Sequence, residues 1–161
     1  MNARKTGPLA AALLLAGSAA QAIGVTDAKG DWVAGYTGSH AGDLDVIGSF
    51  VTYDLGTDAF VFSGTMDGNI GLSPGGFYVW GVNRGAGTAG FAANGVGGVL
   101  FDAVVIVRQD GSVTVNRLGG GGSTTLPAGT AHITGSTISA LVPGNLLPGN
   151  RGNDYLPMRP V

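Results

Sequence analysis

The sequence predicts an all-β fold, a single antiparallel β-sandwich of immunoglobulin-like or jelly-roll-like type. Two observations lead to this prediction. The composition argues against long solvent-exposed helices, because Gly makes up 31 of 161 residues, all ten acidic residues are Asp, and Lys occurs only at positions 5 and 29. In addition, short segments rich in β-branched and aromatic residues alternate with Gly, Asp and Asn turns, which is typical of sandwiches.

The first expected strands form a hairpin. Residues 44–54 and 59–66 are rich in Val, Ile, Phe and Thr, and the Leu-Gly-Thr-Asp sequence at 55–58 supplies the turn. The next expected strand is FYVWGVN at 77–83. Residues 85–98 contain six Gly and show neither a helical nor a strand period, so they predict a long loop.

The strongest strand signal is VLFDAVVIVR at 99–108, which is apolar on both sides of the strand and predicts a central strand covered on both faces. Asp110-Gly111 follows and predicts a hairpin with residues 112–117. The Gly-rich stretch at 119–129 predicts a flexible connection.

A last tight hairpin is expected between residues 130–134 and 137–142, which flank Gly135 and Ser136. Residues 148–161 are rich in Pro, Gly and Asn and predict a C-terminal tail, with Tyr155 as a candidate anchor. The expected β-sandwich domain therefore covers residues 23–147.

Residues 1–22 match a secretory signal peptide. Arg4 and Lys5 precede a short apolar run, and Ala20-Gln21-Ala22 offers a cleavage site after Ala22. The apolar run is shorter than the roughly 18–20 residues that a membrane-spanning helix needs, so no integral membrane segment is expected in the mature chain. We expect an exported bacterial protein, secreted or periplasmic, whose stability depends on burial or a bound ion because it has no Cys.

Charge and motif content exclude two classes of function. A net charge of −2 supplies no surface for neutralising phosphates, so nucleic-acid binding is not expected. The chain has no Glu, no G-x-S-x-G motif and no H-E-x-x-H motif, so no enzyme activity is expected.

Four acidic residues predict a candidate calcium site. Calcium prefers several oxygen ligands, and the first third of the chain offers carboxylates within nineteen positions, at Asp27, Asp31, Asp43 and Asp45. Asp43 and Asp45 would lie on the same face of a strand, where two carboxylates repel unless a cation lies between them. The alternative is that these residues are acids of turns and strand edges in water.

An aromatic strand predicts a candidate ligand-binding surface. Tyr78, Trp80 and Arg84 occupy alternate positions and would point to the same face of a strand. They could form a stacking platform with a polar clamp. In that case Phe77 and Val79 would face inward. The alternative is that Trp80 fills the core, as large aromatic side chains in sandwiches generally do.

Two smaller predictions concern haem and a buried acid. Haem would need axial ligands, and the candidate donors are Met66, His40 and His132. Asp102 lies in an apolar strand and needs a partner, for which an ion pair with Arg84 or Arg108 is expected.

Three pieces of the sequence together resemble DOMON-like domains and family 9 carbohydrate-binding modules. They are an Asp- and Gly-rich segment (27–31 with 42–45), an aromatic strand (78–85) and a late strand ended by proline (137–143). The resemblance covers most of residues 27–147. It implies a sandwich that holds a sugar, a haem or a calcium ion.

The expected function is a non-enzymatic binding or surface-interaction module for an extracellular carbohydrate or other polymer, with calcium as a candidate cofactor. Two alternatives stay open. One is a haem-binding electron-transfer domain, and the other is a structural protein of an extracellular matrix that assembles through exposed strand edges.

Overall fold

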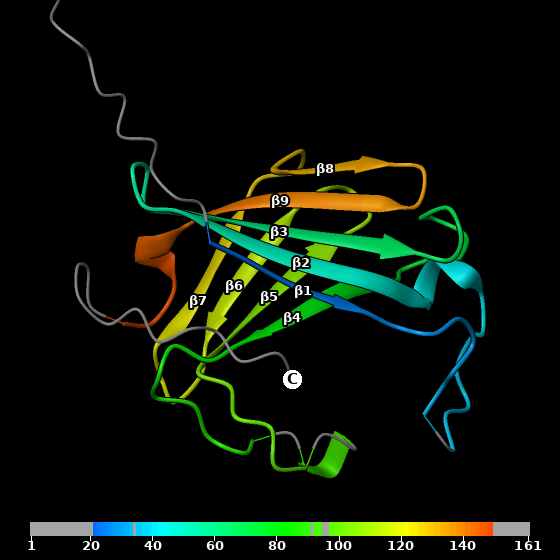
Figure 1. Ribbon diagram of the computed structural model, residues 1–161, viewed down its shortest axis with the longest axis horizontal. Helices are drawn as coiled ribbons and strands as arrows, with labels where there is room; N and C mark the ends of the chain where they lie inside the picture. Colours follow the sequence, from blue (N-terminus) through cyan, green and yellow to red (C-terminus); the bar gives the residue numbers. More distant parts are fainter. Residues whose placement is uncertain (1–20, 34, 91, 95–96, 150–161) are drawn as a thin grey trace, which may run out of the picture.

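The computed structural model describes residues 21–33, 35–90, 92–94 and 97–149. Within these residues, nine strands form two antiparallel sheets that pack face to face (Figure 1). The fold class predicted from the sequence, an all-β sandwich, is therefore confirmed. None of the helices in the described part of the chain is long and apolar enough to cross a membrane.

The two sheets have five and four strands. The larger one has the order β1-β2-β3-β9-β8, and the smaller one has the order β4-β5-β6-β7. The strands of the larger sheet are β1 (Gln21–Thr26), β2 (Val46–Asp54), β3 (Ala59–Met66), β8 (Ala131–Thr134) and β9 (Thr137–Pro143). Those of the smaller sheet are β4 (Phe77–Val82), β5 (Ala103–Arg108), β6 (Val113–Arg117) and β7 (Gly122–Leu126). Short 3-10 turns lie at η1 (Gly42–Leu44), η2 (Ala92–Asn94) and η3 (Gly144–Leu146).

The three expected hairpins are all present. β2 pairs with β3, β5 with β6, and β8 with β9, each in antiparallel register. The turn between β2 and β3 contains Asp58 at a φ of 48°, a left-handed conformation that Asp tolerates better than most residues. Turn chemistry read from the sequence thus located these hairpins correctly.

The structure contains two strands that were not predicted, and several strand boundaries differ; β2, for example, begins at Val46 rather than at residue 44. β7 lies in the stretch expected to be a flexible connection, because Thr and Ser residues that carry no apolar signal pair with β6. β5 begins at Ala103 rather than at residue 99. β1 was not predicted. It begins at Gln21, so its first two residues, which pair with β2, precede the expected cleavage site after Ala22. The rest of the expected leader, and residues 150–161 of the expected tail with Tyr155, lie outside the described residues.

The core lies between the two sheets. β5 is a central strand, as expected, and its residues Ala103, Val105 and Val107 are fully buried against the other sheet. On the opposite face of β5, Val104 is also buried. The buried apolar residues of the core are Phe60, Phe62, Met66, Tyr78, Val82, Ala103, Val105, Val107, Val113, Val115, Ala131, Ile138, Ala140, Val142 and Leu147.

Close backbone contact organises the end of the sandwich that carries η1, seen at the right of Figure 1. The Gly68 nitrogen donates to the Gly42 carbonyl oxygen at 2.8 Å, and a Cβ at Gly42 would lie 3.0 Å from the Gly68 nitrogen. Glycine at both positions therefore lets η1 pack directly on the segment after β3. The Asp67 nitrogen also donates to the Asp45 carbonyl oxygen at 2.9 Å. These contacts fix the segments from which the candidate site is built.

Candidate functional site

A groove with a volume of about 560 Å³ opens at this end of the sandwich. One wall comes from the segment between β1 and η1, and the other comes from the segment that leads into β4. We call it the aromatic groove. Its described lining residues are Trp32, Val33, Tyr36, Ser39, Leu44, Ser73, Pro74, Gly75, Gly76 and Phe77.

The first wall is an aromatic cluster. The rings of Trp32 and Tyr36 stack with centroids 5.3 Å apart and planes inclined by 8°. His40 meets both rings edge-on, at 4.9 Å from Trp32 and 5.5 Å from Tyr36. A turn in which the Tyr36 nitrogen donates to the Val33 carbonyl at 2.9 Å brings these rings together. Tyr36 remains 42% exposed, so part of the cluster faces solvent.

The second wall is held from behind by buried polar contacts. The Ser73 nitrogen and hydroxyl donate to the two carboxylate oxygens of Asp43, at 2.7 and 2.8 Å. The Gln109 side chain, from the β5–β6 turn, donates to the Ser73 carbonyl oxygen at 2.7 Å, and the Gly76 nitrogen donates to the same oxygen at 3.0 Å. Asp43 is completely buried. The wall from Ser73 to Gly76 is therefore preorganised by residues that do not line the groove.

A second hollow, the edge pocket, has a volume of about 210 Å³ and lies beside β4. It shares Leu44 and Phe77 with the aromatic groove. Phe77 is 58% exposed and Val79 is 51% exposed, so both side chains are accessible to a ligand at this pocket. The described residues that line the edge pocket are Leu44, Val46, Ser49, Met66, Phe77, Tyr78, Val79 and Trp80.

Three of the four acidic residues proposed as calcium ligands accept hydrogen bonds within the chain. Asp43 lies in η1 rather than on a strand and accepts from Ser73. Asp45 accepts from the Gly30 nitrogen at 2.8 Å. Asp27 is exposed and accepts from the nitrogen of the adjacent Ala28 at 3.1 Å, and Asp31 is also exposed. The expectation that Asp43 and Asp45 share one face of a strand is therefore wrong.

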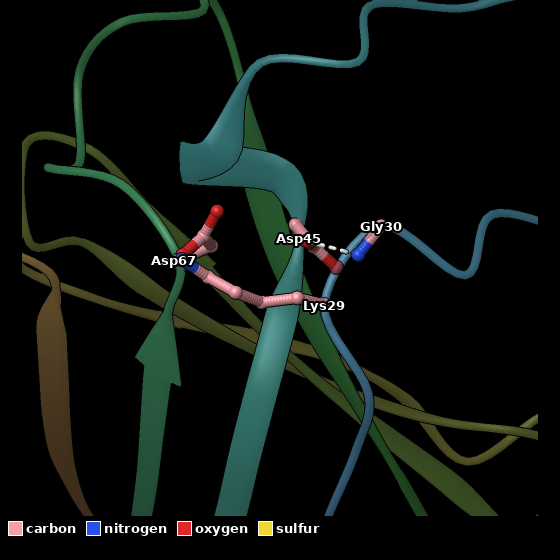
Figure 2. A network of polar contacts seen from close by, with 4 residues as sticks. All are labelled: Lys29, Gly30, Asp45 and Asp67. Carbon is pink, nitrogen blue, oxygen red and sulfur yellow. Dashed lines mark hydrogen bonds and ion pairs between the residues drawn. The ribbon is translucent and has the colours of Figure 1, made fainter.

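Lys29 supplies the positive charge in this region. Figure 2 shows it reaching from the segment after β1 to Asp67, beside the carboxylate of Asp45. The hydrogen bond that Lys29 donates to Asp67, together with the negative charge of Asp67, holds the pKa of Lys29 above its usual value, and the charge of Asp45 adds to this rise. Within the described ranges, no group of three or more His, Cys, Asp or Glu side chains is placed to hold a metal ion.

The predicted stacking platform has the opposite orientation. Tyr78 is 5% exposed and belongs to the core, and Trp80 packs partly buried against it. The Trp80 indole nitrogen donates to the Ser49 hydroxyl of the facing sheet at 2.9 Å. Phe77 and Val79, which would face inward beside such a platform, face outward instead. The alternative that Trp80 contributes to the core describes the structure better.

Arg84 and Asp102 are in contact, but not as an ion pair. Asp102 accepts from the backbone nitrogens of Arg84 and Ala86, at 2.7 and 3.2 Å. The Arg84 guanidinium points elsewhere, lying 5.3 Å from the Phe60 ring centroid and donating to the Gly144 carbonyl oxygen at 3.4 Å. Arg108 donates to the Thr114 hydroxyl at 2.9 Å. The predicted ion pair is replaced by backbone hydrogen bonds that hold the turn after β4.

The haem donors lie in three different environments. Met66 is buried in the core, and His132 is exposed on the other face of the same sheet, where its ring nitrogen and the Thr134 hydroxyl are 3.1 Å apart. His40 belongs to the aromatic cluster. The sheet thus separates Met66 from His132. A haem on one side of the sheet could not have both residues as axial ligands.

Trp32, Tyr36 and Phe77 were not predicted as site residues. The repeated spacing of four between Trp32, Tyr36 and His40 was the available signal, because it is unusual in a segment otherwise rich in Gly, Asp and Ser. Comparison with protein-family models, curated proteins and solved structures finds no match to the chain. The resemblance to DOMON-like domains and family 9 carbohydrate-binding modules therefore stays a prediction.

Proposed function

We propose that the chain is an exported, non-enzymatic carbohydrate-binding module that binds an extracellular polysaccharide in the aromatic groove. The observation that supports this most directly is the composition of the groove. Trp32, Tyr36 and Phe77 bring three aromatic rings to it, and Ser39 adds a hydroxyl. No charged side chain is among its described lining residues.

The chemistry of saccharides suits such a surface. A pyranose ring has apolar C–H faces and a polar rim of hydroxyl groups, so it can pack on an aromatic ring while its hydroxyls bind polar groups at the edge. Ligand sites generally combine apolar and aromatic walls with a few placed polar groups. Here the Tyr36 hydroxyl, the Ser39 hydroxyl and the backbone from Pro74 to Gly76 are the polar groups that could bind the rim. The anchoring of Ser73 by Asp43 lowers the cost of ordering this wall on binding.

The test is affinity electrophoresis of the mature protein in gels that contain soluble polysaccharides. We expect retardation by at least one neutral polymer, and we expect Trp32→Ala to abolish it while the protein remains folded. Phe50→Ala is the matched control, because Phe50 is an exposed aromatic residue of β2 that lines neither the aromatic groove nor the edge pocket. Retardation lost with Phe50→Ala and kept with Trp32→Ala, or no retardation by any polymer, would contradict the proposal.

Calcium dependence is a separate part of the proposal. The carboxylates of Asp27 and Asp31 are exposed and belong to the segment that leads into the aromatic cluster. Calcium held there, with water and backbone oxygens completing its shell, would order this segment. Calorimetry should then show calcium binding at or below millimolar concentration, and a chelator should lower the melting temperature. If calcium gives no binding heat and the chelator leaves the melting temperature unchanged, calcium binding is contradicted. Saccharide binding in the aromatic groove is not affected by that result.

Export rests on the N-terminal sequence. The exported protein should begin at Ile23, which N-terminal sequencing can determine. Cleavage there leaves β1 with Ile23–Thr26 and removes only two residues at the end of an edge strand. An exported protein that still carries residues 1–22 would contradict cleavage after Ala22.

A structural role in an extracellular matrix is the second candidate, and β7 is the observation that favours it. β7 is an edge strand with the sequence GSTTL and is exposed over most of its length. It has no charge or Pro to prevent pairing with another chain. Light scattering separates the two functions, because a binding module should remain a discrete species, whereas a matrix protein should form larger assemblies as its concentration rises.

A further inference from the structure

The aromatic groove and the edge pocket meet at Phe77. Both are lined by Leu44 and Phe77, so a ligand that leaves the groove past the Phe77 ring reaches the edge pocket. A cavity of ~150 Å³ is enough for one six-membered ring. The edge pocket, at about 210 Å³, therefore has room for one such ring, and the groove, at about 560 Å³, has room for more.

The edge pocket runs along a strand whose outer edge is unpaired in its sheet. β4 is the terminal strand of the smaller sheet, and four consecutive residues of it, from Phe77 to Trp80, line the pocket. Alternate backbone groups of an edge strand have no partner in the sheet. They are donors and acceptors available to ligand hydroxyls. Ser49, from β2, contributes a hydroxyl on the other side of the pocket.

We propose that the site binds an uncharged saccharide chain rather than a single sugar. The chain runs from the aromatic groove past Phe77 and along the edge of β4, with Val79 under the next unit. This inference rests on the proposed function and assigns its ligand as an oligomer or polymer of neutral sugars. Phe77, exposed between the two hollows, packs against the chain where it passes from one to the other.

The restriction to uncharged units follows from the described residues that line the two hollows. None of them is an acid, a Lys or an Arg. Two charged residues next to lining residues, Asp43 and Arg108, have partners of their own. Asp43 is buried against Ser73, and Arg108, opposite Phe77 in the β4–β5 register, donates to Thr114. A uronate or an amino sugar would lose hydration at such a surface without gaining a partner of opposite charge.

An extended peptide could also pair with the edge of β4, because strand addition is a common mode of peptide recognition. The stacked Trp32–Tyr36 pair and the exposed Phe77 ring favour a saccharide, since backbone pairing alone does not call for three aromatic rings in one groove. Peptide binding is therefore one outcome of the test.

The test is calorimetry of the mature protein with β-1,4-glucan and β-1,4-mannan oligomers, from the monosaccharide to the hexasaccharide. For the series that binds, the affinity should rise at least about tenfold between one and three units and then level off. Val79→Lys should weaken trisaccharide binding about tenfold and leave monosaccharide binding unchanged. Leu141→Lys is the matched control, because Leu141 is exposed to a similar degree on the outer face of the other sheet and should have no effect.

The outcomes separate this inference from the proposed function. Equal affinities for all lengths, or an equal effect of Val79→Lys on short and long oligomers, would overturn the chain-binding inference while leaving a sugar site in place. Binding only of charged oligomers, such as uronates, would also overturn it. No binding of any saccharide, or Val79-dependent binding of an uncharged extended peptide instead, would overturn both.

Discussion

Ser73 donates two hydrogen bonds to Asp43, one from its backbone nitrogen at 2.7 Å and one from its hydroxyl at 2.8 Å. Both residues are buried, and thirty positions separate them in the sequence. The pair joins η1 to the wall of the aromatic groove and so couples the fold to the candidate site. A change at Asp43 should therefore affect both stability and ligand binding.

Replacing Asp43 tests this coupling. Asp43→Ala leaves two buried donors of Ser73 without an acceptor and should lower the free energy of unfolding by about 2–4 kcal/mol. Asp43→Asn should cost much less, because the amide oxygen can accept from the Ser73 nitrogen while the Ser73 hydroxyl turns to accept from the amide nitrogen. Urea unfolding measures both changes. Asp31→Ala, at an exposed acid, is the control and should leave stability unchanged when a chelator is present.

The difference between Asp43→Ala and Asp43→Asn should also be seen in their affinity for the ligand. With the wall from Ser73 to Gly76 released, Asp43→Ala should bind the retarding polysaccharide more weakly than Asp43→Asn, even at a temperature where both are folded. Equal stability of the two variants would show that the carboxylate does not hold the wall.

The fold was more predictable than the orientation of its site strand. The hairpins could be located because turn residues and alternating β-branched residues act locally. The outward face of β4 could not be identified in this way. Polar residues do not alternate with apolar ones there, since the strand contains the consecutive apolar or aromatic residues Phe77, Tyr78, Val79 and Trp80. Tertiary contacts decide which of these side chains face the core. A Cβ at Gly64, on the facing sheet, would lie 3.1 Å from the Trp80 ring, so Gly64 provides the space in which the indole packs.

Trp80→Phe tests the contact between the sheets. Phe keeps most of the apolar area but loses the hydrogen bond from the indole nitrogen to Ser49. The free energy of unfolding should fall by about 1–2 kcal/mol. Ser49→Ala should have a smaller effect in wild type and almost none in Trp80→Phe, so the double-mutant cycle gives the coupling of the pair. Additive effects of the two substitutions would show that the hydrogen bond contributes nothing.

The pairing of the two walls of the aromatic groove was beyond sequence analysis. Trp32 and Tyr36 lie in a segment without secondary structure, and their stacking depends on the turn at Val33. The opposite wall comes from residues forty positions later, held by Asp43 and Gln109. Contacts between such distant loops leave no periodic pattern. The Asp-rich segment beside these residues suggested calcium. The sequence shows that carboxylates are present there, but it does not show which hydrogen-bond donors of the chain they accept from.

At Asp102, substitution by Asn should lower the free energy of unfolding less than substitution by Ala. One of its carboxylate oxygens accepts from the backbone nitrogens of Arg84 and Ala86, and the other, also buried, has no partner among the described residues. Asp102→Asn keeps the accepting oxygen and should cost about 1 kcal/mol, whereas Asp102→Ala should cost about 2–4 kcal/mol. Faster amide exchange at Arg84 and Ala86 in the Ala variant would locate the loss. Equal costs for both variants would contradict this role.

Tyr78 should make stability fall at alkaline pH. Its hydroxyl is buried and has no hydrogen-bond partner among the described residues. Burial raises the pKa of Tyr78 to about 12, and the negative charge of Asp43 adds to the rise. In the unfolded chain the pKa of Tyr is about 10. Between these two pH values the unfolded state loses a proton that the folded state keeps, so the free energy of unfolding decreases as pH rises from about 10 to 12.

Tyr78→Phe isolates this contribution from those of the other Tyr residues. At pH 7 it removes a hydroxyl that has no partner, so the variant should be as stable as the wild type or more stable by about 0.5–1 kcal/mol. The advantage of the variant should grow from pH 10 to pH 11, because only the wild type carries the buried phenol. Urea unfolding at pH 7, 10 and 11 measures it. A loss of more than about 1 kcal/mol at pH 7 would mean that the hydroxyl is hydrogen-bonded in solution, since an unpaired buried group contributes no stability that its removal could take away.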